Sequence, residues 1–180
     1  MLDYEFLYII SIPIYILFIV YIIWKKVSIK KIILYTLFYF YMISLIAVTI
    51  FPIPIQGLKE IWIYANGNNN FIHLKSITDI LSNDNLSYMI KMKQIIWNIV
   101  LFIPMWFFIP LIFKNINIFK KALSLWILLS FLIEITQFAI SSLLGFNYKV
   151  TDIDDILLNT LGFTIGFILY KIFLIGIYKE

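Results

Sequence analysis

The chain has 180 residues; 63% of them are hydrophobic, only 13% are charged, and the formal net charge is +4. Soluble domains are nearer half apolar and a quarter charged. The composition therefore excludes an ordinary water-soluble globule, a disordered chain and a coiled coil, and indicates an integral membrane protein. The chain has no cysteine, which excludes disulfides, zinc thiolates and cysteine nucleophiles. Every basic residue is a lysine between apolar runs, so we expect no nucleic-acid partner.

Apolar runs of membrane-spanning length recur along the chain, because a bilayer core about 30 Å thick needs roughly 20 apolar helical residues. They cover about residues 6–24, 32–51, 95–113, 122–140 and 156–177. We therefore predict an all-α integral membrane protein with about five transmembrane helices in one bundle. We also predict that residues 1–180 form a single membrane domain whose principal partner is the lipid bilayer.

The placement of charge orients the predicted spans. Lysines gather in the first and third loops and in the tail, whereas the N-terminus and the fourth loop are acid-rich. The positive-inside rule then places the N-terminus outside and the C-terminus inside. Lys91 and Lys93 do not fit this pattern, since they lie at the outer end of the third span.

The second loop, about residues 52–94, is the only long one. A turn-rich linker at 66–70 precedes residues 71–81, where Leu74, Ile77, Ile80 and Leu81 fall at helical spacing. We predict a short amphipathic helix here, lying on the external face of the membrane that the protein spans. The alternative is a solvated loop with one helical turn.

The last three spans contain polar residues at positions where burial in hydrocarbon costs free energy. Asn98, Glu134 and Gln137 lie within apolar runs. Asp155 and Asn159 lie at the start of the fifth span. An ionisable group in hydrocarbon costs a few kcal/mol or more, so an intramembrane carboxylate is a functional hypothesis by default. Helical spacing places Glu134 and Gln137 on one face, and another face carries the acids and amide of the fifth span: Asp152, Asp155 and Asn159.

We predict that these side chains form an outward-opening polar pocket that binds a polar head group or a cation. Its residues are Asn98, Glu134, Gln137, Asp152, Asp155 and Asn159. Clustered carboxylates without a basic partner share protons or bind a cation, so a divalent cation at Glu134 and Asp155 stays open. No other cofactor is predicted. The alternative is a hydrogen-bonded network that holds three helices together.

The fifth span also carries local structural signals. Thr151 followed by Asp154 is similar to a capping box, with Thr151 as the N-cap. Gly162 and Gly166 form a Gly-xxx-Gly pair that permits close helix packing in membranes.

Three segments resemble the VanZ-like family of small bacterial membrane proteins over about residues 70–170. They are Asn98 to Pro104, Glu134 to Gln137, and Thr151 to Gly162, with Gly166 following in phase. In the segment Asn70 to Lys75, His73 stands where the family commonly has proline. A proton-carrying role for His73 is the less favoured reading, against a surface histidine with no special role.

The resemblance implies a multi-pass protein of the bacterial cytoplasmic membrane, linked to glycopeptide resistance and especially to teicoplanin. The leading hypothesis is a cell-envelope protein that lowers susceptibility to lipid-tailed glycopeptides, with an envelope lipid or a glycopeptide as ligand. The alternatives are a membrane enzyme acting on a lipid-linked envelope substrate, a small proton-coupled transporter, and a purely structural partner protein.

Overall fold

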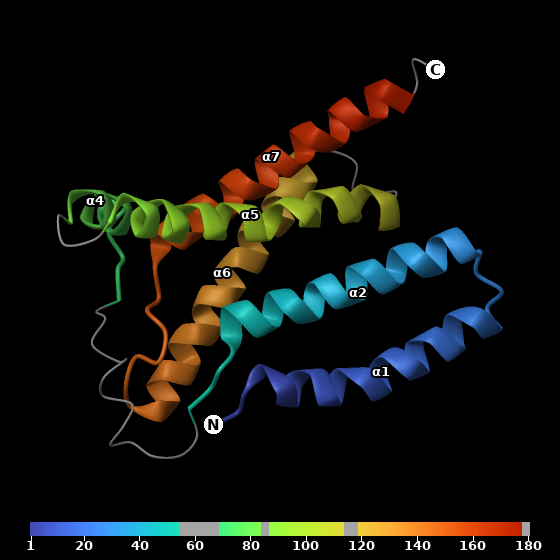
Figure 1. Ribbon diagram of the computed structural model, residues 1–180, viewed down its shortest axis with the longest axis horizontal. Helices are drawn as coiled ribbons and strands as arrows, with labels where there is room; N and C mark the ends of the chain where they lie inside the picture. Colours follow the sequence, from blue (N-terminus) through green and yellow to red (C-terminus); the bar gives the residue numbers. More distant parts are fainter. Residues whose placement is uncertain (55–68, 84–86, 114–118, 178–180) are drawn as a thin grey trace. The chain divides into compact units, whose positions relative to one another are not determined.

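The computed structural model describes residues 1–54, 69–83, 87–113 and 119–177, and these are helical with two isolated β-bridges (Figure 1). Five of the helices are long and apolar enough to cross a membrane, which confirms the predicted fold class. They are α1 (Tyr4–Trp24), α2 (Ile29–Ile50), α5 (Tyr88–Ile112), α6 (Phe119–Leu144) and α7 (Ile153–Ile177). The inside or outside placement of the termini stays a prediction.

Helix α5 begins earlier than the apolar run that predicted it. The run starts at Ile95, and the span of membrane character also starts there, but the helix already begins at Tyr88. Residues 88–94 include Met, Lys and Gln, which are good helix formers. Hydropathy therefore marks the membrane-spanning part of α5, while the helix propensity of residues 88–94 extends the helix beyond that part.

The predicted short amphipathic helix is present as α4 (Lys75–Ser82). It starts later than residue 71 because Leu74 adopts a left-handed backbone conformation with φ of +63°. Side chains larger than glycine rarely adopt this conformation, so the chain turns sharply before α4. The linker predicted at 66–70 lies mostly outside the described residues, and the position of α4 on a membrane surface stays a prediction.

The chain divides into two compact units, Met1–Asn66 and Gly67–Glu180. In the first, α1 and α2 form an antiparallel hairpin. The Tyr15 hydroxyl lies 2.9 Å from Thr36 Oγ1, and the Tyr39 hydroxyl donates to the Ser11 carbonyl at 2.6 Å. Leu2 and Ile53 pair as an antiparallel bridge beside the open end of the hairpin. The single membrane domain stays a prediction.

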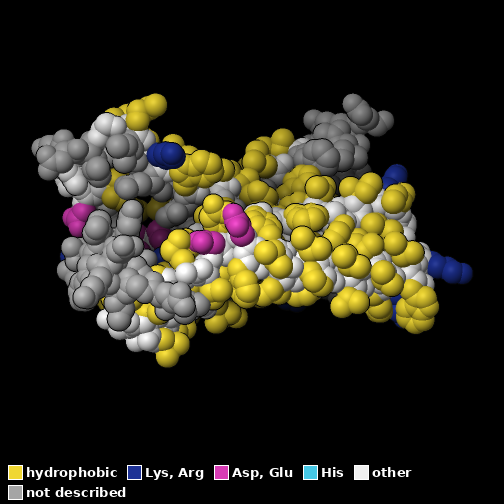
Figure 2. All heavy atoms as spheres, turned by 60° about the horizontal axis from the view of Figure 1, so that its bottom comes forward, with side chains coloured by type: hydrophobic (Ala, Val, Ile, Leu, Met, Phe, Trp, Pro, Cys, Tyr) yellow, Lys and Arg dark blue, Asp and Glu magenta, His cyan; other side chains and the backbone are white. Residues whose placement is uncertain are grey.

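The outer faces of α1 and α2 are apolar, as expected of helices that face lipid. Large side chains such as Leu17 and Trp24 are about 70% exposed. Figure 2 shows hydrophobic side chains over the right-hand part of the visible face, with several lysines at its right-hand end. Lysines at the ends of apolar spans suit the membrane–water interface.

In the second unit, α5 and α7 run parallel and α6 runs antiparallel to α7. Gly162 packs against Ile99 and Gly166 against Ile103, so the α5–α7 register is constant over a helical turn. A Cβ atom on either glycine would collide with the facing carbonyl oxygen. The two glycines are thus required for this close approach, in line with the predicted Gly-xxx-Gly packing.

Aromatic side chains fill the interior of this unit. Trp106, Trp126, Phe102 and Phe163 are at most 1% exposed. The rings of Trp126 and Phe163 stack at 5.4 Å, and Trp106 meets Phe163 edge-on at 4.7 Å. This core joins α5, α6 and α7, and it holds the polar N-terminal end of α7 in a fixed place beside α6.

Candidate functional site

The first turn of α7 is capped by Asp152. Its Oδ1 accepts a hydrogen bond of 2.9 Å from the backbone N–H of Asp154, the second residue of the helix. A carboxylate is favourable there because the helix N-terminus carries partial positive charge. The prediction that Thr151 is the N-cap is therefore wrong by one residue, since the charged acceptor takes that position.

Asp154 caps a different helix from the one that contains it. Its side chain is 1% exposed and accepts hydrogen bonds from the backbone N–H groups of Leu74, Ser76 and Ile77, at 2.6, 2.9 and 3.3 Å. These groups belong to the start of α4, which lacks a capping side chain of its own. The expectation that Asp154 serves the start of α7 is corrected: it anchors α4 to α7.

Asn70 ties the same loop to the start of α7, and sequence reasoning did not select it as a site residue. Its backbone N–H donates to the Thr151 carbonyl at 2.9 Å, and its carbonyl accepts from the Ile153 N–H at 3.0 Å. Its side-chain amide donates to Asp152 Oδ1 and to Ser76 Oγ, each at 2.9 Å. The signal that could have found it is its position at the head of the Asn70 to Lys75 segment.

Glu134 is the buried carboxylate of α6, with 4% of its surface exposed. Its Oε2 accepts a hydrogen bond of 2.9 Å from the backbone N–H of Asp152. Among the described residues, no donor is bonded to the second oxygen, Oε1. One side of the carboxylate is therefore held by the start of α7, while the other retains its acceptor capacity.

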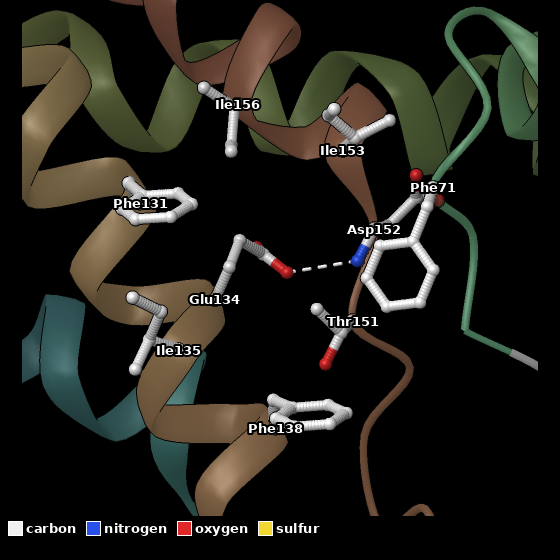
Figure 3. A pocket seen from close by; sticks show the side chains of 9 residues that line it. All are labelled: Phe71, Phe131, Glu134, Ile135, Phe138, Thr151, Asp152, Ile153 and Ile156. Carbon is white, nitrogen blue, oxygen red and sulfur yellow. Dashed lines mark hydrogen bonds between the residues drawn. The ribbon is translucent and has the colours of Figure 1, made fainter.

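Glu134 lies at a pocket of about 250 Å³. Figure 3 shows Glu134 reaching from α6 towards Asp152, with aromatic and branched aliphatic side chains around the space. The lining residues are Phe71, Phe131, Glu134, Ile135, Phe138, Thr151, Asp152, Ile153 and Ile156. The accessible walls are almost entirely carbon, and the carboxylate lies beneath their surface. The outward-opening polar pocket stays a prediction.

The other predicted site residues lie away from this lining. Asn98 donates to Asp155 Oδ1, joining α5 to α7. Asn159 donates to Ser130 Oγ at 2.8 Å, joining α7 to α6. Gln137 is buried one turn beyond Glu134 on α6. Asn98 and Asn159 thus connect helices, and of the six predicted side chains only Glu134 and Asp152 reach the pocket.

Two ionisable side chains stand in the segment between α6 and α7. Burial lowers the pKa of Lys149 to about 8 and raises the pKa of Tyr148 to about 12. Desolvation disfavours the charged form of both groups, which explains why the shifts have opposite signs.

The described residues hold no group of three His, Cys, Asp or Glu side chains suited to a metal ion. His73 is exposed, before α4. A divalent cation at Glu134 and Asp155 stays a prediction.

The family model for VanZ/LLP1 matches residues 38–174. The match begins inside α2, well before the segment at residue 70 where the resemblance was first evident, and it includes the whole site described above. No curated protein and no solved structure matches the chain. With five membrane-length helices and a family match over most of its length, this multi-pass membrane protein belongs to the VanZ/LLP1 family.

Proposed function

We propose that this protein resides in the bacterial cytoplasmic membrane and lowers susceptibility to teicoplanin-type lipoglycopeptides. The observation that carries the proposal is the Glu134 carboxylate, held by the Asp152 N–H at the edge of an apolar pocket. A lipid-tailed glycopeptide combines an apolar chain with a polar body. A site that offers carbon walls and one hydrogen-bonding carboxylate suits a ligand of that kind.

The size of the pocket favours the tail over the whole drug. Its volume of about 250 Å³ lies below the roughly 300–1,000 Å³ of sites that enclose drug-sized ligands. Only part of a glycopeptide could enter, and apolar walls select the lipid tail. A glycopeptide without a lipid tail has no apolar chain to fill the pocket. We therefore expect protection against lipid-tailed glycopeptides but not against glycopeptides that lack a tail.

The predicted orientation supports the same proposal. With the N-terminus outside, α7 begins at the outer surface, and the pocket beside its first turn lies in the outer half of the membrane. Lipid-tailed glycopeptides act at that surface. Because the C-terminus is predicted to lie inside, α7 would run inwards from the outer surface. The aromatic core would then lie deeper in the membrane than the pocket.

The test is a susceptibility comparison in a sensitive Gram-positive strain. The strain would express the wild type, Glu134→Ala or Glu134→Gln at matched membrane levels. Asp79→Ala serves as the control, because Asp79 is an exposed carboxylate on α4. We expect the wild type and Asp79→Ala to protect against teicoplanin but not vancomycin, and Glu134→Ala to lose protection.

Glu134→Gln separates charge from shape. Glutamine can still accept the Asp152 N–H through its side-chain oxygen, so the local backbone should be preserved. Loss of protection in this variant indicates that the charge or the proton of Glu134 matters. Full protection by Glu134→Ala would contradict the proposal.

A further inference from the structure

The open side of the pocket lies on the outer face of α6. Phe131, Ile135 and Phe138 line the pocket and are each between 45% and 50% exposed. Their spacing places them on one face of the helix. The neighbouring Leu128 and Leu132 are exposed to a similar degree. The mouth of the pocket is therefore part of an apolar stripe along α6.

This stripe is expected to lie at the depth of lipid chains. The three lining residues fall inside the membrane-spanning segment Lys120–Leu144. At a rise of about 1.5 Å per residue they lie roughly 9–20 Å from its Leu144 end, within a hydrocarbon core about 30 Å thick. Alkyl chains of the bilayer are therefore the expected neighbours of a pocket mouth at this depth.

Polar groups stand behind these apolar walls. Thr151 lines the pocket with 7% of its surface exposed, and its Oγ1 is buried with no hydrogen-bond partner among the described residues. Glu134 contributes an oxygen, Oε1, to which no described donor is bonded. Figure 3 shows the two side chains reaching from α6 and from the segment before α7. Glu134 Oε1 thus lies just behind the pocket wall as an acceptor unused by the described residues, while the Thr151 hydroxyl is buried behind that wall.

Hydrophobic burial alone does not select a chain that arrives from the bilayer. Transfer of a methylene from water to an apolar site is worth about 0.8 kcal/mol, but lipid tails are already as apolar as leucine. Preference for one chain over bulk lipid must come from shape and from hydrogen bonds. Glu134 Oε1 supplies such hydrogen-bonding capacity.

We propose that the pocket opens sideways into the bilayer and takes one alkyl chain of a membrane-inserted amphiphile that carries a hydrogen-bonding group beside the chain. The inference deepens the proposed function, on which it rests, by naming the ligand class and the route of entry. A drug with a lipid tail would reach Glu134 from the membrane rather than from water. An envelope lipid with the same chemistry would compete for the same space.

The experiment uses the full chain in nanodiscs that contain a phospholipid with a photoactivatable diazirine in one acyl chain. After illumination, mass spectrometry locates the cross-linked residues. We expect several-fold more cross-linking at Phe131, Ile135 and Phe138 than at Leu128 and Leu132, which are equally exposed but lie outside the pocket. Equal cross-linking at both sets would overturn the proposal.

A matched pair of variants and a competitor test occupancy. Ile135→Trp should fill the pocket and reduce cross-linking at Phe131 and Phe138 several-fold, whereas Leu132→Trp should not. With the wild type, teicoplanin should compete with the lipid probe more strongly than vancomycin does. Equal competition by the two drugs would count against entry of the tail, and this arm does not depend on the folding of a variant.

The two proposals fail in different ways. Pocket cross-linking together with unchanged teicoplanin protection in Glu134→Ala would support the lateral chain site and contradict the resistance function. Loss of protection in Glu134→Ala without preferential cross-linking would support the function and overturn entry from the bilayer.

Discussion

The α1–α2 hairpin and the α5–α7 bundle are both built from membrane-length helices, but different chemistry holds them together. The hairpin uses hydroxyl contacts such as Tyr15–Thr36 and pairs of aromatic rings. The bundle buries the carboxylates Glu134 and Asp154 and several amides, whereas Ser11 is the single buried polar residue among the described residues of the first unit.

Energetics explains why this difference is informative. A hydroxyl can bond its own helix backbone and costs little in a membrane, but a carboxylate in hydrocarbon costs a few kcal/mol or more. Two carboxylates are buried in the described part of the bundle, and one of them, Asp154, caps α4 through three hydrogen bonds. Glu134 is the carboxylate whose structural contacts do not use all of its acceptor capacity, so the comparison directs attention to its pocket.

The largest effect should come from breaking the bundle at Gly162. A valine there places its Cβ against the Ile99 carbonyl, and overpacking of this kind typically costs about 1–3 kcal/mol or more. We expect Gly162→Val to lower the thermal unfolding temperature in detergent or nanodiscs. Ala139→Val, which adds bulk at an exposed position on α6, is the control. Wild-type stability of Gly162→Val would contradict the close α5–α7 approach.

A more local effect should follow from Asp154→Ala. The substitution leaves the N–H groups of Leu74, Ser76 and Ile77 without their acceptor, and loss of a helix cap costs about 0.5–2 kcal/mol. Hydrogen exchange should show lost protection of α4, while α6 and the core of α7 stay protected. Asp79→Ala removes an exposed carboxylate from α4 and should change little. Unchanged exchange in Asp154→Ala would show that α4 is anchored by other contacts.

The hairpin should be less sensitive to loss of a single polar contact. Tyr15→Phe removes the hydroxyl that lies 2.9 Å from Thr36, and interhelical hydrogen bonds in membranes are worth about 0.6 kcal/mol on average. We expect a small fall in stability, compared with no change for Tyr4→Phe at an exposed position. A loss of stability as large as that of Gly162→Val would contradict the expectation that the hairpin is less sensitive than the bundle.

A pH-dependent effect concerns the segment between α6 and α7. The pKa of Lys149 is lowered in the folded protein from 10.5 to about 8, so the unfolded chain binds more protons between these values and stability rises with pH across that window. Lys149→Met should raise the unfolding temperature at pH 7 and flatten the rise from pH 8 to 10. A wild-type profile that falls with pH over that range would contradict the burial of Lys149.

Sequence reasoning predicted the spans because bilayer thickness sets a minimum length for an apolar helix. It did not predict the partners of the polar residues. Helical spacing groups Asp152, Asp155 and Asn159 on one face of α7, yet their side chains bond Asn70, Asn98 and Ser130 respectively. Partners this far apart in the chain depend on tertiary packing, which periodicity along one helix does not encode.

The left-handed turn at Leu74 and the capping of α4 by Asp154 were also beyond sequence reasoning. Leucine rarely adopts a positive φ, and nothing local to residues 71–75 signals that it does so here. Capping rules look for an acceptor within a few residues of the helix start, whereas the acceptor for α4 is about 80 residues away. The apolar pocket follows from this arrangement, because Phe71 reaches its wall only when the loop is tied to α7.

The parallel α5–α7 pair also has a consequence for how the protein is made. Ile99 precedes its packing partner Gly162 by 63 residues, and α6 is synthesised between them. At a translation rate of about 5–20 residues per second, α5 waits roughly 3–13 s for its principal neighbour. During that interval Asn98 has been translated but its acceptor on Asp155 has not. Completion of the polar end of the bundle is therefore a late event in biosynthesis, set by arrival of the last span at the membrane.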